Sequence, residues 1–169
     1  MPNRGHIIIV NDNPVDADVL QELLEIDGYR VDKKANGKNA LTDISEAKPN
    51  LILLGDSLPD INPFSLLAKL KQGKQTKYIP VIFLTTLTDT DTRIKGVELG
   101  DDLITKPFEA REVLARVERQ VTVSKVRMAL RESETKFRSV MESAIDAIIS
   151  ADVSGNIRSW NSAATALFG

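Results

Sequence analysis

The sequence predicts an α/β protein with a doubly wound, five-stranded parallel sheet, followed by one long helix. Two observations lead to this fold class. Short apolar runs rich in β-branched residues alternate with helical patterns five times along the chain, which is typical of a parallel sheet joined by right-handed crossovers. The main runs are apolar at consecutive positions, as expected for strands that helices cover on both faces.

The predicted strands are three buried runs and two shorter segments. The buried runs are 7–10, 51–54 and 80–84, and the shorter strands are 29–33 and 103–105. After the first run, Asn13 is expected to cap a helix, with Pro14 at its first position and Gly28 after its end. The apolar face of this helix is predicted to consist of Val15, Val19, Leu20, Leu23 and Ile26. Three further helical patterns carry Ala40, Leu41 and Ile44; Leu66, Leu67 and Leu70; and Ile94, Val97 and Leu99.

One long helix is expected from Glu109 to Ile145, because no glycine or proline interrupts this stretch. Its apolar residues form two seams at spacings of three and four, a pattern typical of pairing with another helix. We expect the second half to leave the globular domain and to form a coiled-coil-like homodimer. The residues expected at this contact are Val117, Val121, Val126, Leu130 and Phe137. The alternative is a terminal helix that packs on its own domain and ends in a frayed polar tail.

Composition excludes several classes of function. The chain has 169 residues, a formal net charge of -2, one His and no Cys. The absence of Cys excludes disulfides, Cys-ligated metal sites and thiol nucleophiles, and a single His excludes a His-based metal cluster. The charge gives no basic footprint for nucleic acid, and no apolar run approaches the roughly 18 residues of a membrane span. We therefore expect a cytoplasmic protein with neither a nucleic-acid nor a membrane partner.

Polar residues follow the predicted strands at their carboxyl ends. Because parallel strands end at one edge of the sheet, a carboxylate, hydroxyls and an ammonium group are expected to converge there. Each alone has a plain structural role, such as a loop cap or a solvated charge, but convergence from four strands favours a functional site. The residues expected at this edge are Asn11, Asp12, Gly55, Asp56, Thr85 and Lys106.

Four strings in the chain resemble the receiver domain of response regulators, over roughly residues 5–122. They are IIIVNDNP, PNLILLGDSLPDINPF, IPVIFLTTLTD and ELGDDLITKPF. The resemblance implies a flavodoxin-like receiver fold. In such receivers, two acidic residues after strand one and an aspartate after strand three bind Mg²⁺, and that aspartate accepts a phosphoryl group from a histidine kinase. A Thr or Ser after strand four and a Lys before Pro contact the phosphoryl group.

The correspondence with receivers holds at some positions and fails at others. Asp12, Thr85 and Lys106 match the second acidic residue, the hydroxyl residue and the lysine. Asn11 stands at the first acidic position and keeps an oxygen without the charge. Gly55 stands at the acceptor position, counted either from Pro49 or from Pro59, and has no side chain to phosphorylate. Leu103 stands where receivers place an aromatic switch residue.

These departures predict a pseudo-receiver, which keeps the fold but does not run the phosphorylation cycle. Asp56 is the alternative acceptor, but the alternation of strand side chains would direct it to the face opposite Gly55. Mg²⁺ binding is expected to be weak, because Asp12 is the one carboxylate clearly in place. No other cofactor is expected. Lys106 is expected to pair with Asp12 or Asp56.

Residues from about 132 to 169 resemble the beginning of a PAS sensory domain, through the string ESETKFRSVMESAIDAIISADVSGNIRSWNSAATALFG. A hairpin is predicted between 147–151 and 157–160, and Asn161 with Ser162 is expected to cap a last helix. So few elements cannot bury a core, so the chain is expected to end inside this domain, without haem or flavin. The expected domains are a receiver at 1–122, a helical coiled-coil-like linker at 123–143 and a truncated PAS segment at 144–169.

These features predict a signal-transduction module of a two-component phosphorelay, which acts by protein interaction and dimerisation and is not an enzyme. The expected partner is a sensor kinase or an output domain. Two alternatives stay open: a receiver phosphorylated at Asp56, and the N-terminal regulatory part of a larger receiver–PAS enzyme, either a histidine kinase or a cyclic-dinucleotide enzyme. A flavodoxin-like cofactor binder is disfavoured, because the loop from Asn11 to Pro14 is acidic and contains proline, unlike a phosphate-binding loop.

Overall fold

The structure, a computed structural model, describes residues 3–86 and 90–169, apart from the side chain of Thr92. The chain divides into two compact units, Met1–Lys125 and Val126–Gly169. The first unit holds the parallel sheet, and the second holds the end of the long helix with a small hairpin. Each unit has its own hydrogen bonds and packing.

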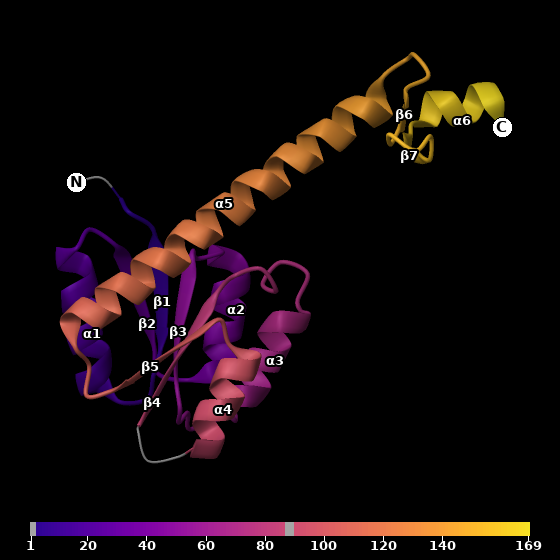
Figure 1. The fold of residues 1–169 in the computed structure, drawn as a ribbon. Helices are drawn as coiled ribbons and strands as arrows, with labels where there is room; N and C mark the ends of the chain where they lie inside the picture. The colour runs from indigo at the N-terminus through magenta and orange to yellow at the C-terminus, as the bar shows by residue number, and fades with distance from the viewer. Residues whose placement is uncertain (1–2, 87–89) are drawn as a thin grey trace. The chain divides into compact units, whose positions relative to one another are not determined.

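The first unit contains the predicted five-stranded parallel sheet, with strand order β2-β1-β3-β4-β5 (Figure 1). Its strands are β1 His6–Val10, β2 Arg30–Lys34, β3 Leu51–Gly55, β4 Val81–Thr86 and β5 Asp102–Lys106. The fold class is therefore confirmed. Strand order reverses at β1, which has β2 on one side and β3 on the other. Ligand sites of doubly wound sheets lie at this switch point, outside the carboxyl ends of the strands.

Helices cover both faces of the sheet (Figure 1). They are α1 Pro14–Ile26, α2 Gly37–Ala47, α3 Pro63–Gln72, α4 Thr90–Leu99 and α5 Ala110–Ser143. One buried cluster packs α1 and α5 on one face, through residues such as Leu20 and Val117. The other packs α2 and α3 on the opposite face, through residues such as Ile44 and Leu66. The side chains of Asn13, Asn36 and Asn62 cap the first three helices, as preferred for N-cap residues.

The predicted apolar face of α1 is wrong at three positions. Val15, Val19 and Ile26 are 68%, 51% and 80% exposed. The residues that pack on the sheet are Ala17, Leu20 and Leu24. At 3.6 residues per turn these two groups lie on opposite sides of the helix, so α1 carries apolar residues on both its buried and its exposed side.

Helix α4 differs from expectation in the same way. Ile94, Val97 and Leu99 are about half exposed or more. Gly96 is buried, and a Cβ at this position would lie 3.1 Å from Leu103 Cδ1 and 3.3 Å from Phe83 Cδ1. A glycine therefore brings the α4 backbone close to the sheet, while the larger apolar side chains of the helix stay in solvent.

The long helix α5 lies close to its predicted limits, but part of the predicted dimer contact is wrong. Val117 and Val121 are 0% and 3% exposed, because the first half of α5 covers the sheet of its own unit. Val126, Leu130 and Phe137 are 64%, 59% and 65% exposed. The helices within the described residues include none long and apolar enough to cross a membrane.

The second unit consists of the end of α5, an antiparallel hairpin and a short helix. Its elements are β6 Ile149–Ala151, β7 Ile157–Trp160 and α6 Ser162–Phe168. The predicted hairpin and its following helix are therefore present. Across residues 126–169, all of which are described, Asn161 and Ala164 alone are buried. Hydrogen bonds rather than a hydrophobic core hold this unit together.

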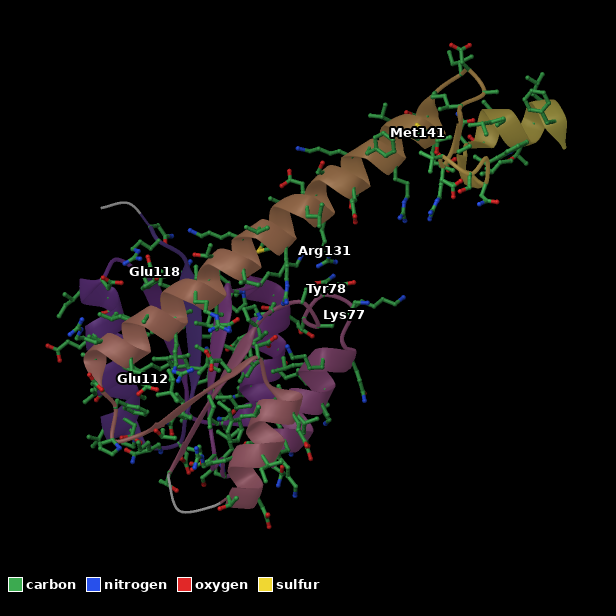
Figure 2. All side chains as sticks on the ribbon, viewed as in Figure 1. Lys77, Tyr78, Glu112, Glu118, Arg131 and Met141 are labelled. Carbon is green, nitrogen blue, oxygen red and sulfur yellow. The ribbon has the colours of Figure 1, made fainter. Side chains whose placement is uncertain are left out.

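The side chain of Asn161 connects several parts of the second unit. Its Oδ1 accepts hydrogen bonds from the N–H groups of Ile148 and Ala164, both at 2.9 Å. Its Nδ2 donates to the carbonyl oxygens of Met141, which is labelled near the end of α5 in Figure 2, and of Asp146, both at 2.9 Å. These contacts use both acceptor sites and both donor hydrogens of the amide. The asparagine thus joins the end of α5 to the hairpin and to the first turn of α6.

We expect Asn161→Ala to unfold the second unit, because the substitution removes four hydrogen bonds worth about 1 kcal/mol each. Amide hydrogen exchange followed by NMR is the measurement, with loss of protection expected from Ile148 onward and unchanged protection in the first unit. The matched control is Asn156→Ala, which alters an exposed asparagine in the hairpin turn and should keep the protection. Equal protection in both variants would contradict this role of Asn161.

Candidate functional site

The carboxyl ends of the strands bring the predicted site residues together. In the sheet, Gly55 of β3 lies beside Leu84 of β4, and Thr86 of β4 lies beside Lys106 of β5. Asn11 follows β1 directly, and its backbone N–H donates to the carbonyl of Lys34. The edge predicted from the sequence is therefore one continuous edge of the folded sheet.

Gly55 is buried beneath the side chain of Asn11. A Cβ at position 55 would lie 3.1 Å from both Cγ and Oδ1 of Asn11, closer than ordinary van der Waals contact. Asn11 is only 4% exposed, and its Oδ1 accepts a hydrogen bond from the N–H of Asn13 at 3.0 Å. A side chain at position 55 would therefore crowd the amide of Asn11, which would have to shift by a few tenths of an ångström.

Lys106 forms its shortest ion pair with a residue that sequence reasoning missed. Its Nζ lies 2.9 Å from Oδ2 of Asp16 and 3.8 Å from Oδ1 of Asp56. Asp16 lies in the first turn of α1, where an acidic residue is favoured by the helix dipole. Its place three residues after the N-cap Asn13 is the signal that could have found it. Of the two expected partners, Asp56 lies within ion-pair distance, whereas Asp12 accepts a hydrogen bond from Ser57 Oγ at 3.1 Å instead.

Asp56 does not point away from the site, contrary to expectation. Strand β3 ends at Gly55, so the alternation of side chains along a strand no longer applies one residue later. Oδ2 of Asp56 accepts a hydrogen bond from the N–H of Thr86 at 3.3 Å, and Oδ1 faces Lys106. The carboxylate thus lies among the ends of β3, β4 and β5.

The loop that carries Asp56 is fastened to the start of α2. The carboxylate of Asp60 accepts hydrogen bonds from the N–H groups of Gly37 and Lys38 at 2.8 and 2.9 Å. These two hydrogen bonds, that of Gly37 first, hold the pKa of Asp60 below its ordinary value. The loop after β3 is therefore anchored at its far end as well as at the strand.

The two remaining site residues are buried or partly buried. Thr85 is 1% exposed, and its hydroxyl donates to the carbonyl oxygen of Thr86 at 3.3 Å. Leu103, at the switch position, packs against the core cluster on the side of α2 and α3. A leucine has no polar side-chain group, so it cannot form or break a hydrogen bond when it changes position.

The residues at this edge do not form a good magnesium site. The described residues contain no group of three or more His, Asp or Glu side chains placed to hold a metal ion. Gly55 supplies no side-chain oxygen, and Oδ1 of Asn11 is already engaged by the Asn13 N–H. Mg²⁺ prefers several hard oxygen ligands in near-octahedral geometry, and this set does not provide them.

Comparison with known proteins identifies the first unit. The family model described as the response regulator receiver domain matches residues 7–118. The chain belongs to this receiver family. A model described as the PAS fold matches residues 135–169. The receiver is thus a component of two-component signalling, and it is followed by a segment that matches the PAS fold.

Similar proteins are regulators and receivers. The uncharacterized transcriptional regulatory protein YkoG of Bacillus subtilis (strain 168) is 37% identical over 138 residues, 81% of this chain and 56% of that protein. The DNA-binding dual master transcriptional regulator RpaA of Synechocystis sp. is 36% identical over 112 residues, 66% of this chain and 46% of that protein. The signal receiver domain of a signal transduction histidine kinase from Syntrophus aciditrophicus is 34% identical in its crystal structure. Its TM-score is 0.65, over 70% of this chain and 90% of that one.

The chain spans about half the length of the curated relatives that it matches. The expectation that nucleic acid plays no part is wrong for this family, because RpaA is named as a DNA-binding regulator. A net charge of -2 describes the receiver and the PAS segment, and it carries no information about the other domains of a regulator.

We expect Gly55→Ala to lower the free energy of unfolding by about 1–3 kcal/mol, because the new Cβ displaces the buried amide of Asn11. In an Asn11→Ala background the same substitution should be nearly neutral, since the crowding atoms are gone. Urea unfolding of the four proteins gives the coupling energy, expected at about 1 kcal/mol or more. An equal cost of Gly55→Ala in both backgrounds would show that Asn11 does not crowd this position.

Proposed function

We propose that this chain is a pseudo-receiver joined to a PAS segment, a signalling module that acts by protein interaction and dimerisation without phosphorylation of an aspartate. The observation that carries the proposal is Gly55 at the acceptor position, with the amide of Asn11 packed closely against it. Phosphoryl transfer to a receiver needs a nucleophilic carboxylate, and a metal ion to neutralise the transferred oxygens. Glycine cannot supply the nucleophilic carboxylate, and the uncharged amide of Asn11 weakens binding of the metal ion.

The second candidate function is a receiver that accepts a phosphoryl group at Asp56. The 3.8 Å separation between Asp56 Oδ1 and Lys106 Nζ favours it. Two contacts weigh against it. Asp16 lies closer to the ammonium than Asp56 does, and the other oxygen of Asp56 is directed at the Thr86 N–H rather than toward Asp12. We therefore rank it below the pseudo-receiver.

Incubation with acetyl phosphate and Mg²⁺ is expected to leave the intact mass of the protein unchanged, because no acceptor carboxylate stands at position 55. Mass spectrometry of the intact chain is the measurement, with a receiver that carries the acceptor aspartate treated in parallel. If the chain gains the mass of one phosphoryl group and Asp56→Asn does not, then Asp56 is the acceptor and the pseudo-receiver proposal is wrong.

The exposed half of α5 supports dimerisation as part of this function. Val126, Leu130, Phe137 and Val140 are all more than half exposed. With Ser133 they are spaced by four, three, four and three residues, which places them on one seam of a coiled coil. A second copy of the chain presents the same seam, so a pair of helices would cover both. We propose this homodimer as the way in which the receiver transmits its state along the helix.

Leu130→Glu is expected to weaken dimerisation by about 100-fold, because it buries a carboxylate without a partner in the seam. Light scattering after size-exclusion chromatography reports the mass of the particle, expected to fall from dimer to monomer. The control is Thr135→Glu, which adds the same charge on the opposite side of the helix and should leave the dimer intact. A full chain that is monomeric at every concentration would remove the dimer from the proposal.

Under the same proposal, the module regulates an output domain or a partner protein. The relatives offer two kinds: a DNA-binding transcriptional regulator and a histidine kinase. The PAS match after the receiver fits a receiver–PAS sensor enzyme, and the similarity to RpaA fits a DNA-binding regulator. In either case the chain described by the structure is the regulatory part and not the enzyme.

A further inference from the structure

We propose that the carboxylate of Asp56 is a resident anion of the receiver, which takes the place of a transferred phosphoryl group and holds the strand ends in one state. This inference rests on the proposed pseudo-receiver function and says how that function is regulated. A receiver without an acceptor lacks the ligand that would bias its two states. The contacts of Asp56 supply a bias from within the chain.

Two groups that favour an anion converge on Asp56. The Nζ of Lys106 lies 3.8 Å from its Oδ1, and the N–H of Thr86 donates to its Oδ2 at 3.3 Å. An ammonium group and a backbone N–H at the end of a strand are the kinds of donor that bind carboxylate or phosphoryl oxygens. The side chains of Asp56 and Lys106 are 23% and 20% exposed, so both are largely withdrawn from water.

Lys106 also contacts Asp16. The 2.9 Å contact with Asp16 and the 3.8 Å contact with Asp56 place one ammonium within reach of two carboxylates. The four residues of this cluster come from α1, the end of β3, β4 and β5. The anion therefore connects segments that are distant in the sequence, which is what a ligand must do to bias a conformational equilibrium.

An anion that is part of the chain differs from a bound phosphoryl group in one respect. Its local concentration is fixed by the covalent link and does not depend on a kinase or on free ligand. Because the anion cannot leave, the receiver is expected to stay in its biased state under all phosphorylation conditions. Removing the carboxylate is then the change that shifts the equilibrium.

The first test is ¹H–¹⁵N NMR of the full chain as wild type, Asp56→Asn and Asp12→Asn. In Asp56→Asn the amide of Thr86 should shift, and its hydrogen exchange should become about fivefold faster, because a neutral side chain replaces the ionised acceptor of its hydrogen bond. Asp12→Asn is the matched control. It removes a carboxylate from the same edge that contacts Ser57 rather than Lys106, and it should leave Thr86 unchanged. An unchanged Thr86 amide in Asp56→Asn, or an equal change in Asp12→Asn, would overturn the inference.

The second test restores the anion from solution. In Asp56→Ala, sodium formate should move the Thr86 amide resonance back toward its wild-type position, relative to sodium chloride at equal ionic strength. In Asp56→Ala with Lys106→Met the formate should have no such effect, because the cation is gone. No response of Asp56→Ala to formate, or an equal response in the double variant, would count against a resident-anion site.

The outcomes separate this inference from the proposed function. A phosphoryl group found on Asp56 after treatment with acetyl phosphate would end the pseudo-receiver proposal, and with it the resident anion. If the wild type is not phosphorylated and Asp56→Asn leaves the Thr86 amide unchanged, the resident-anion inference is wrong and the pseudo-receiver proposal stands.

Discussion

The packing of the Asn11 amide against Gly55 is the contact on which the rest of the receiver site depends. Because glycine leaves room, Asn11 lies inward and its Oδ1 receives the N–H of Asn13. Asn13 in turn caps α1, with its side chain accepting from the N–H groups of Val15 and Asp16. The first turn of α1 is thereby set, and Asp16 reaches Lys106. Gly55 and the Lys106–Asp16 pair are thus linked through Asn11, Asn13 and the first turn of α1.

The ammonium at this edge is paired within the chain instead of waiting for a ligand. The ammonium of Lys106 has two carboxylates within 4.0 Å, and the second of these also has the Thr86 N–H. Ion pairs that keep some contact with water contribute about 1 kcal/mol or less each, so the cluster does not stabilise the fold strongly. Its effect is on geometry: it defines where the ends of three strands and one helix lie relative to each other.

The sequence predicted the sheet, the order of elements and most of the site, because strand periodicity and the polar residues at strand ends are local signals. It failed where the environment decides. Val15 and Val19 are apolar but exposed, since apolar spacing alone does not say which side of a helix meets the sheet. Asp56 lies inside the site because β3 ends one residue earlier, and strand ends are the least predictable boundaries. Asp16 was missed because its role appears only once α1 and β5 are placed in space.

The amide of Asn161 gives the joint after α5 a mechanical property. This one side chain bonds the carbonyl of Met141, near the end of α5, and the N–H of Ala164 in the first turn of α6. Ser162 Oγ also donates to the carbonyl of Glu142. These hydrogen bonds restrict rotation of the hairpin relative to the end of α5. A twist of the final turns of α5 is therefore carried into the hairpin as a rotation, where a glycine-rich linker would absorb it.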